Sequence, residues 1–123
     1  MTESSQRSSP DSHGTVNLTT AAAELLEEAR AANAGRAGRT LTPGAGGPLK
    51  QTLLALLAGQ HLQDHASPGA ATLQVLQGAV RLTTSDDVEL GAGDHAPIPS
   101  EKHGLEARDD AVVLLTVAQP QGS

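Results

Sequence analysis

Histidines near the ends of short strand-like runs are the side chains in this sequence best suited to chemistry. One run leads from Gly59 to His65, and a second leads from Gly93 through His95 towards His103. An imidazole can bind a transition metal or transfer a proton near neutral pH. A histidine on a half-buried strand is more commonly a hydrogen-bonded core or rim residue, so both roles stay open for each of them.

Neighbours of these histidines offer further chemistry. Glu101 lies two residues before His103, and a carboxylate beside an imidazole can serve proton transfer, although a solvated loop is the plainer alternative. Ser67, two residues after His65, lacks the orienting acid and the oxyanion hole of a catalytic triad. His61 shares a face with His65 on an unbroken strand, but the two would then lie about 13 Å apart, too far to share an ion.

The first part of the chain supplies a tail, a helix and a linker. Residues 1–17 are polar and predict a disordered tail, because they cannot bury enough apolar surface to offset their ordering entropy. Within 18–48, Thr19 or Thr20 can cap a helix over 21–33, and the rest is a linker rich in Gly and Pro. The apolar stripe of the helix is narrow, so it must pack either on the sheet of its own chain or on a partner subunit.

From residue 49 the pattern changes to short strand-like segments separated by turn residues. Such segments at roughly regular spacing indicate an antiparallel sandwich or barrel, which we place at 49–118. Gly78 is predicted to mark a hairpin, and residues 119–123 a frayed tail. The predicted strands are 49–57, 60–66, 71–76, 79–84, 88–90, 96–98, 102–107 and 111–118, with 39–42 as a candidate edge strand in the linker.

These segments resemble the two sequence motifs of the cupin superfamily, and in particular the small single-domain cupins of bacteria. The first motif contains, in order, Gly, His, His, Glu and Gly, and the second contains Gly, Pro and His. The resemblance implies an all-β fold, a single cupin-type jelly-roll β-barrel with one N-terminal α-helix. The matching residues are Gly59, His65 and Gly78 in the first motif and Gly93, Pro99 and His103 in the second.

The resemblance also implies a barrel lumen that can hold one divalent transition metal, such as Mn, Fe, Ni, Zn or Cu, on three imidazoles and a carboxylate. His65 and His103 stand at two ligand positions, and His95 could face the lumen and supply a third nitrogen. Ser67 and Ala71 stand at the places of the second His and of the Glu. The metal-binding motif is therefore degenerate.

Composition restricts the function further. The chain has no Phe, Tyr, Trp or Cys, which excludes aromatic stacking of a ligand or base and excludes disulfides and thiolate metal sites. The net charge is −6, and four Lys/Arg against nine Asp/Glu in residues 49–123 give −5 for the barrel, which argues against binding nucleic acid or anionic membranes. The start lacks the layout of a signal peptide, so a cytoplasmic protein is expected.

Three functions follow, in order of preference. The first is a binding module that holds a small molecule, and a metal weakly or not at all, in the lumen, where Gln74 is expected beside the histidines. The second is a metal-dependent enzyme of dioxygenase or isomerase type with His65 and His103 as ligands. The third is a structural or regulatory accessory protein. Edge strands and a modest core without aromatics favour a homodimer.

Overall fold

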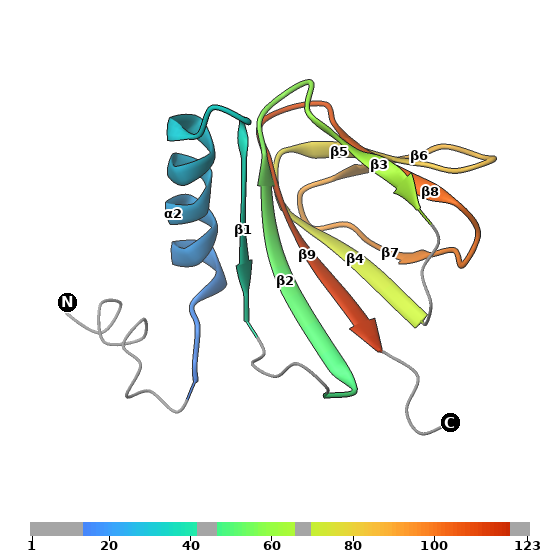
Figure 1. The fold of residues 1–123 in the computed structure, drawn as a ribbon, viewed down its shortest axis with the longest axis horizontal. Helices are drawn as coiled ribbons and strands as arrows, with labels where there is room; N and C mark the ends of the chain where they lie inside the picture. The colour runs from blue at the N-terminus through green and yellow to red at the C-terminus, as the bar shows by residue number, and fades with distance from the viewer. Residues whose placement is uncertain (1–13, 42–46, 66–69, 119–123) are drawn as a thin grey trace.

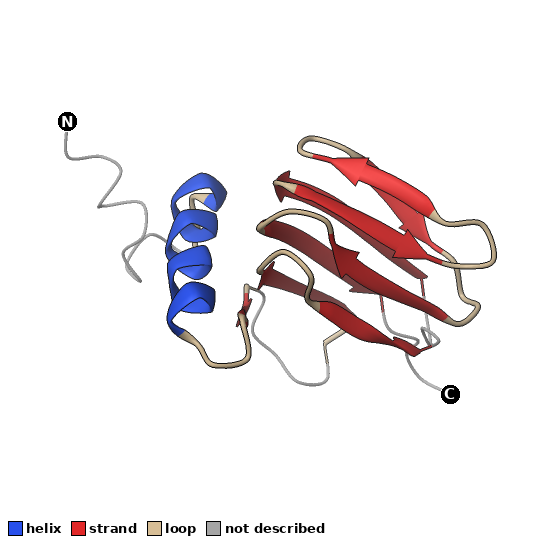
Figure 2. Ribbon diagram, turned by 90° about the horizontal axis from the view of Figure 1, so that it is seen from above, coloured by secondary structure: helices blue, strands red, loops and turns tan. Residues whose placement is uncertain are grey.

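The computed structural model describes residues 14–41, 47–65 and 70–118, with the backbone alone for residues 64 and 65. Within these residues the chain forms one helix and nine strands, and the strands make two antiparallel sheets that face each other (Figures 1 and 2). The elements are α2 (Leu18–Ala31), β1 (Arg36–Thr40), β2 (Leu49–Leu56), β3 (His61–His65), β4 (Ala70–Gln77), β5 (Ala79–Thr83), β6 (Val88–Gly91), β7 (His95–Ile98), β8 (His103–Ala107) and β9 (Ala111–Ala118).

One sheet has five strands in the order β1-β2-β9-β4-β7, and the other has four in the order β3-β8-β5-β6. The predicted all-β jelly roll with one N-terminal helix is confirmed. The predicted linker contributes to it, because β1 pairs with β2 along its whole length. Most of the predicted tails, at 1–13 and 119–123, and residues 42–46 of the linker lie outside the described residues.

Apolar side chains line the space between the sheets, and we call them the inter-sheet core. Because strand side chains alternate between faces, β4 and β9 send every second residue into this core. β9 is buried over its first four residues, partly buried over the next three and exposed at its last residue. The inter-sheet core consists of Leu56, Ala71, Leu73, Val75, Val80, Leu82, Leu90, Ala96, Ile98, Leu105, Ala107, Ala111 and Val113, flanked by Leu54, Leu62, Leu115 and Val117.

Helix α2 packs on the outer face of the five-stranded sheet of its own chain (Figure 2). Its cap is Asn17, whose side-chain oxygen accepts a hydrogen bond from the backbone N–H of Thr20 at 2.9 Å, so the predicted Thr19 or Thr20 cap is wrong. Among the described residues, no helix has the length and apolar content that crossing a bilayer requires. The helix and sheet share a second apolar cluster, made of Ala21, Ala22, Leu25, Leu26, Ala29, Leu53, Ala55, Val112 and Leu114.

Gly78 joins two strands that belong to different sheets. β4 pairs with β7 and β9, whereas β5 pairs with β6 and β8, so the predicted hairpin at Gly78 is wrong. The chain instead crosses from one sheet to the other at this residue, whose φ is +76°. A left-handed backbone conformation of this kind is open to glycine at no steric cost, and it permits the abrupt change of direction.

Candidate functional site

His103, the first residue of β8, lies with the inter-sheet core. Its exposed fraction is 5%, and it is the only buried polar or charged side chain among the residues that the structure describes. It stands two residues before Leu105 and four before Ala107, both members of the inter-sheet core. Residues two apart on a strand share a face, so the imidazole belongs to the apolar interior.

The imidazole of His103 is held in one tautomer. Its Nδ1 lies 2.9 Å from the backbone carbonyl oxygen of Glu101. A carbonyl oxygen only accepts hydrogen bonds, so Nδ1 carries the proton and donates, and in the neutral ring the lone pair is on Nε2. The same Nδ1–H to carbonyl arrangement orients histidines that coordinate metals through Nε2.

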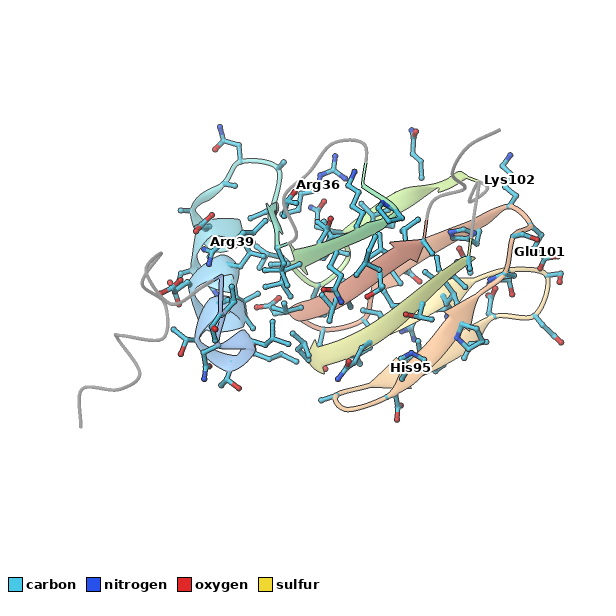
Figure 3. All side chains as sticks on the ribbon, turned by 90° about the horizontal axis from the view of Figure 1, so that it is seen from below. Arg36, Arg39, His95, Glu101 and Lys102 are labelled. Carbon is cyan, nitrogen blue, oxygen red and sulfur yellow. The ribbon has the colours of Figure 1, made fainter. Side chains whose placement is uncertain are left out.

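Glu101 therefore acts on His103 through its main chain. Its carboxylate lies 3.3 Å from the hydroxyl of Ser85 in the next loop. Figure 3 shows the Glu101 side chain at the rim of the molecule, beside Lys102. The predicted carboxylate–imidazole pair for proton transfer is thus replaced by a carbonyl–imidazole pair, which fixes orientation and does not exchange protons.

His65 is the register partner of His103 across β3 and β8. The pairing runs from His61 opposite Glu106 and Leu62 opposite Leu105 to His65 opposite His103, with an irregularity between Leu62 and His65. Cα atoms of directly opposite residues in an antiparallel pair lie about 4.5–5.5 Å apart. The structure therefore brings the backbones of the two predicted ligands together, and the unbroken strand assumed between His61 and His65 is wrong.

His95 and Gln74 do not face the space between the sheets. His95 is exposed on β7, and it alternates with Ala96 and Ile98, which belong to the inter-sheet core (Figure 3). It pairs in register with Gln74, which alternates in the same way with core residues of β4. The expectation that these two side chains face the lumen is wrong, because the phase of the strand alternation places both on the outer face.

The described residues do not supply a full cupin-type metal site. Ala71, at the position of the carboxylate ligand, is a buried methyl group of the inter-sheet core. No group of three or more His, Asp or Glu side chains with metal-binding geometry occurs in the described part of the chain. Ser67 lies outside the described residues. His103 is consequently the one ligand with a defined inward position, where a metal needs three or four.

Solved structures place this architecture in a known fold. No family model and no curated protein matches the sequence. A conserved protein of unknown function from Streptococcus pyogenes matches with a TM-score of 0.66 and 27% identity over 74% of this chain and 80% of that chain. A cupin superfamily protein from Desulfitobacterium hafniense matches with a TM-score of 0.64 and 16% identity over 69% of this chain and 78% of that chain. This is a cupin-fold protein.

The cupin fold alone does not decide between binding and catalysis. A DMSP lyase from Ruegeria pomeroyi has the same fold, with a TM-score of 0.60 and 23% identity over 72% of this cupin and 49% of the lyase. A fold of this kind hosts many functions, and the function has to be argued from the side chains of each site.

Proposed function

We propose that this cupin is a binding module that holds a small molecule between its two sheets, against His103. The observation that carries the proposal is an oriented imidazole that is the one buried polar side chain among the described residues and lies with the inter-sheet core. Burying a polar group in such surroundings is unfavourable unless it is hydrogen-bonded. Small-molecule sites have this composition, with apolar walls and a few placed polar groups that fix the ligand's orientation.

The chemistry of the site defines the ligand class. The His103 ring has a fixed orientation, so the ligand should carry a polar group, such as a hydroxyl or a carboxyl, that can hydrogen-bond with an imidazole. The walls are Leu, Val, Ile and Ala, and the chain has no aromatic side chain to stack on a planar ring. An aliphatic alcohol, acid or sugar-like molecule therefore suits the site better than an aromatic one.

The test is a thermal-shift and NMR screen of small aliphatic alcohols, acids and sugars. We expect members of this panel to bind the wild-type protein, and His103→Gln to weaken that binding about tenfold, as loss of one buried hydrogen bond predicts. His95→Gln is the matched control, because it removes an exposed imidazole from the outer face. Equal binding by wild type and His103→Gln, or no binding by wild type, would contradict the proposal.

The second candidate is a metal-dependent enzyme of dioxygenase or isomerase type. It is favoured by the oriented Nε2 of His103 and by the register pairing of His103 with His65. These two residues would supply two of the ligands of a divalent ion, and that ion would supply Lewis-acid or redox chemistry. Elemental analysis of untagged protein decides: less than about a tenth of an equivalent of any transition metal, with no uptake on soaking, rules this candidate out.

A further inference from the structure

We propose a second binding site, for a small molecule that carries a carboxylate, in a polar groove between β1 and β3. These strands are edge strands of the two different sheets. The groove has a volume of about 560 Å³, which is the size of a small-molecule pocket. Its lining residues, which we call the edge groove, are Arg36, Gly59, Gln60, His61 and Gln63.

The charge of the edge groove is unusual for this acidic chain. Among the described residues no carboxylate lines it, whereas Arg36, Gln60 and His61 can donate hydrogen bonds. Among the described residues, Arg36 is the arginine without a carboxylate in ion-pair range, while Arg30, Arg39, Arg81 and Arg108 each have one or two. An anion would therefore meet a guanidinium that no acidic side chain already neutralises.

The arginines of the neighbouring sheet face show the contrast. On the outer face of the four-stranded sheet, Arg81 and Arg108 lie within 3.8 Å of Glu89 and Glu106, and the hydrogen bond that Arg81 donates to Glu89 raises the pKa of Arg81. In that cluster each arginine is paired with carboxylates. Among the described residues the edge groove contains no such ion pair. It nevertheless lies next to this face, because His61 is the register partner of Glu106.

Backbone hydrogen bonds hold the groove in shape. Leu57 donates to the carbonyl of Gly35 at 3.0 Å, which ties the turn before β3 to the residue that precedes Arg36. Gln60 donates to Leu57 at 3.0 Å and accepts from Ala107 at 2.8 Å. A Cβ at Gly35 would stand 2.9 Å from the side-chain nitrogen of Gln60, so the Gln60 amide packs directly on that turn. The backbone of the groove and the Gln60 amide are thus positioned before any ligand arrives.

A carboxylate is the group that fits this set of donors. The planar guanidinium of Arg36 presents two parallel N–H groups that match the two oxygens of a carboxylate, a geometry that a lysine cannot offer. The Gln60 amide and the His61 imidazole can hydrogen-bond the rest of a small organic acid. The groove lies at the His61 end of β3, away from His103, and Figure 3 shows Arg36 far from Lys102 and Glu101 of the His103 loop.

Titration of the full ¹⁵N-labelled chain at low salt tests this site, with succinate, citrate, inorganic phosphate and uncharged succinamide as probes. We expect both acids to shift the amide signals of Gln60 and His61 and to saturate at millimolar concentrations. Succinamide should bind at least about tenfold more weakly, because it has no charge to pair with Arg36. Phosphate also matches the guanidinium fork, but it has no second group for the Gln60 amide and the His61 imidazole, so it should bind more weakly than the two acids. The proposal is overturned if neither acid gives a saturable shift, or if phosphate binds as well as the acids.

Two arginine variants supply a matched comparison. Arg36→Gln should weaken binding of succinate about tenfold or more, as expected for loss of a charge-assisted bidentate contact. Arg39→Gln should change it less than about twofold, because Arg39 lies on the opposite face of β1 and pairs with Glu24 and Glu28 of α2. Equal effects of the two variants would overturn the proposal. The amide signals of Gln60 and His61 report on the edge groove, whereas a ligand at the other proposed site should shift those of His103 and Leu105, which separates the two sites.

Discussion

Gly78 is the residue at which the chain leaves one sheet for the other, and the structure admits no side chain there. Its φ of +76° is a conformation that L-residues adopt with strain. In addition, a Cβ at this position would overlap the carbonyl oxygen of Asp110 and stand 2.9 Å from the Cα of Ala111. Both contacts are with backbone at the start of the central strand β9, which cannot move aside without breaking the sheet.

Gly78→Ala should therefore destabilise the protein by more than about 3 kcal/mol or prevent folding, because steric overlap adds to the strain of a positive φ. Gly93→Ala is the control, since Gly93 has a φ of +92° but no atom within 4 Å of an added Cβ. That variant should lose only about 1–2 kcal/mol. Urea unfolding followed by far-ultraviolet circular dichroism measures the free energy of unfolding of both variants. Equal losses of stability would show that the overlap of the added Cβ with the Asp110 carbonyl has no effect.

At the scale of elements, helix α2 functions as a cover for the five-stranded sheet. Leu25 is fully buried between the helix and Leu53, Ala55, Val112 and Leu114 of the sheet. Ion pairs from Arg39 of β1 to Glu24 and Glu28 lie on the exposed side of the same contact. Pairs exposed to this degree contribute less than about 1 kcal/mol each, so the apolar contact dominates.

Leu25→Ala should lower the free energy of unfolding by about 2–5 kcal/mol, the usual loss for a leucine removed from a core. Glu27→Ala, on the exposed side of the same helix and paired only with Arg30 among the described residues, should change it by less than about 1 kcal/mol. Chemical denaturation of the two variants provides the measurement. A small effect of Leu25→Ala would mean that the helix is held to the sheet by something other than this cluster.

The strands could be predicted from sequence more reliably than their partners. Turn residues and alternation place β2 and β9 within one residue, because both signals are local. The sheet to which a strand belongs is set by long-range pairing. The sequence around Gly78 therefore predicts a hairpin, although the two flanking strands pair with other strands, β4 with β9 and β5 with β8. Short connections usually join strands that pair, and this sandwich departs from that rule.

The candidate site could be predicted only where local sequence signals suffice. The second motif singles out His103, and the imidazole of this residue is buried in the structure. His95 was misplaced because a four-residue strand gives too few apolar residues to fix which face is inward. Arg36 was missed as a site residue because its groove is formed by two strands from different sheets, and no local pattern signals such a meeting.

For the molecule as a whole, we expect a homodimer. Each sheet has two edge strands, β1 and β7 in one and β3 and β6 in the other, and such edges invite pairing or packing with a second chain. The core is also modest, since it contains no aromatic side chain. Light scattering should give a mass of about 25 kDa, twice the 12.5 kDa of the chain. A mass of one chain at all accessible concentrations would contradict this expectation.

The position of β9 between β2 and β4 has a consequence for synthesis in the cell. Both neighbours leave the ribosome before β9, and at about 5–20 residues per second the gap after β4 lasts several seconds. Throughout that interval β2 and β4 of the nascent chain are exposed, because the strand that pairs with both of them has not yet been made. Chaperones that recognise extended hydrophobic segments have this window in which to act, and translation pauses before residue 111 would lengthen it.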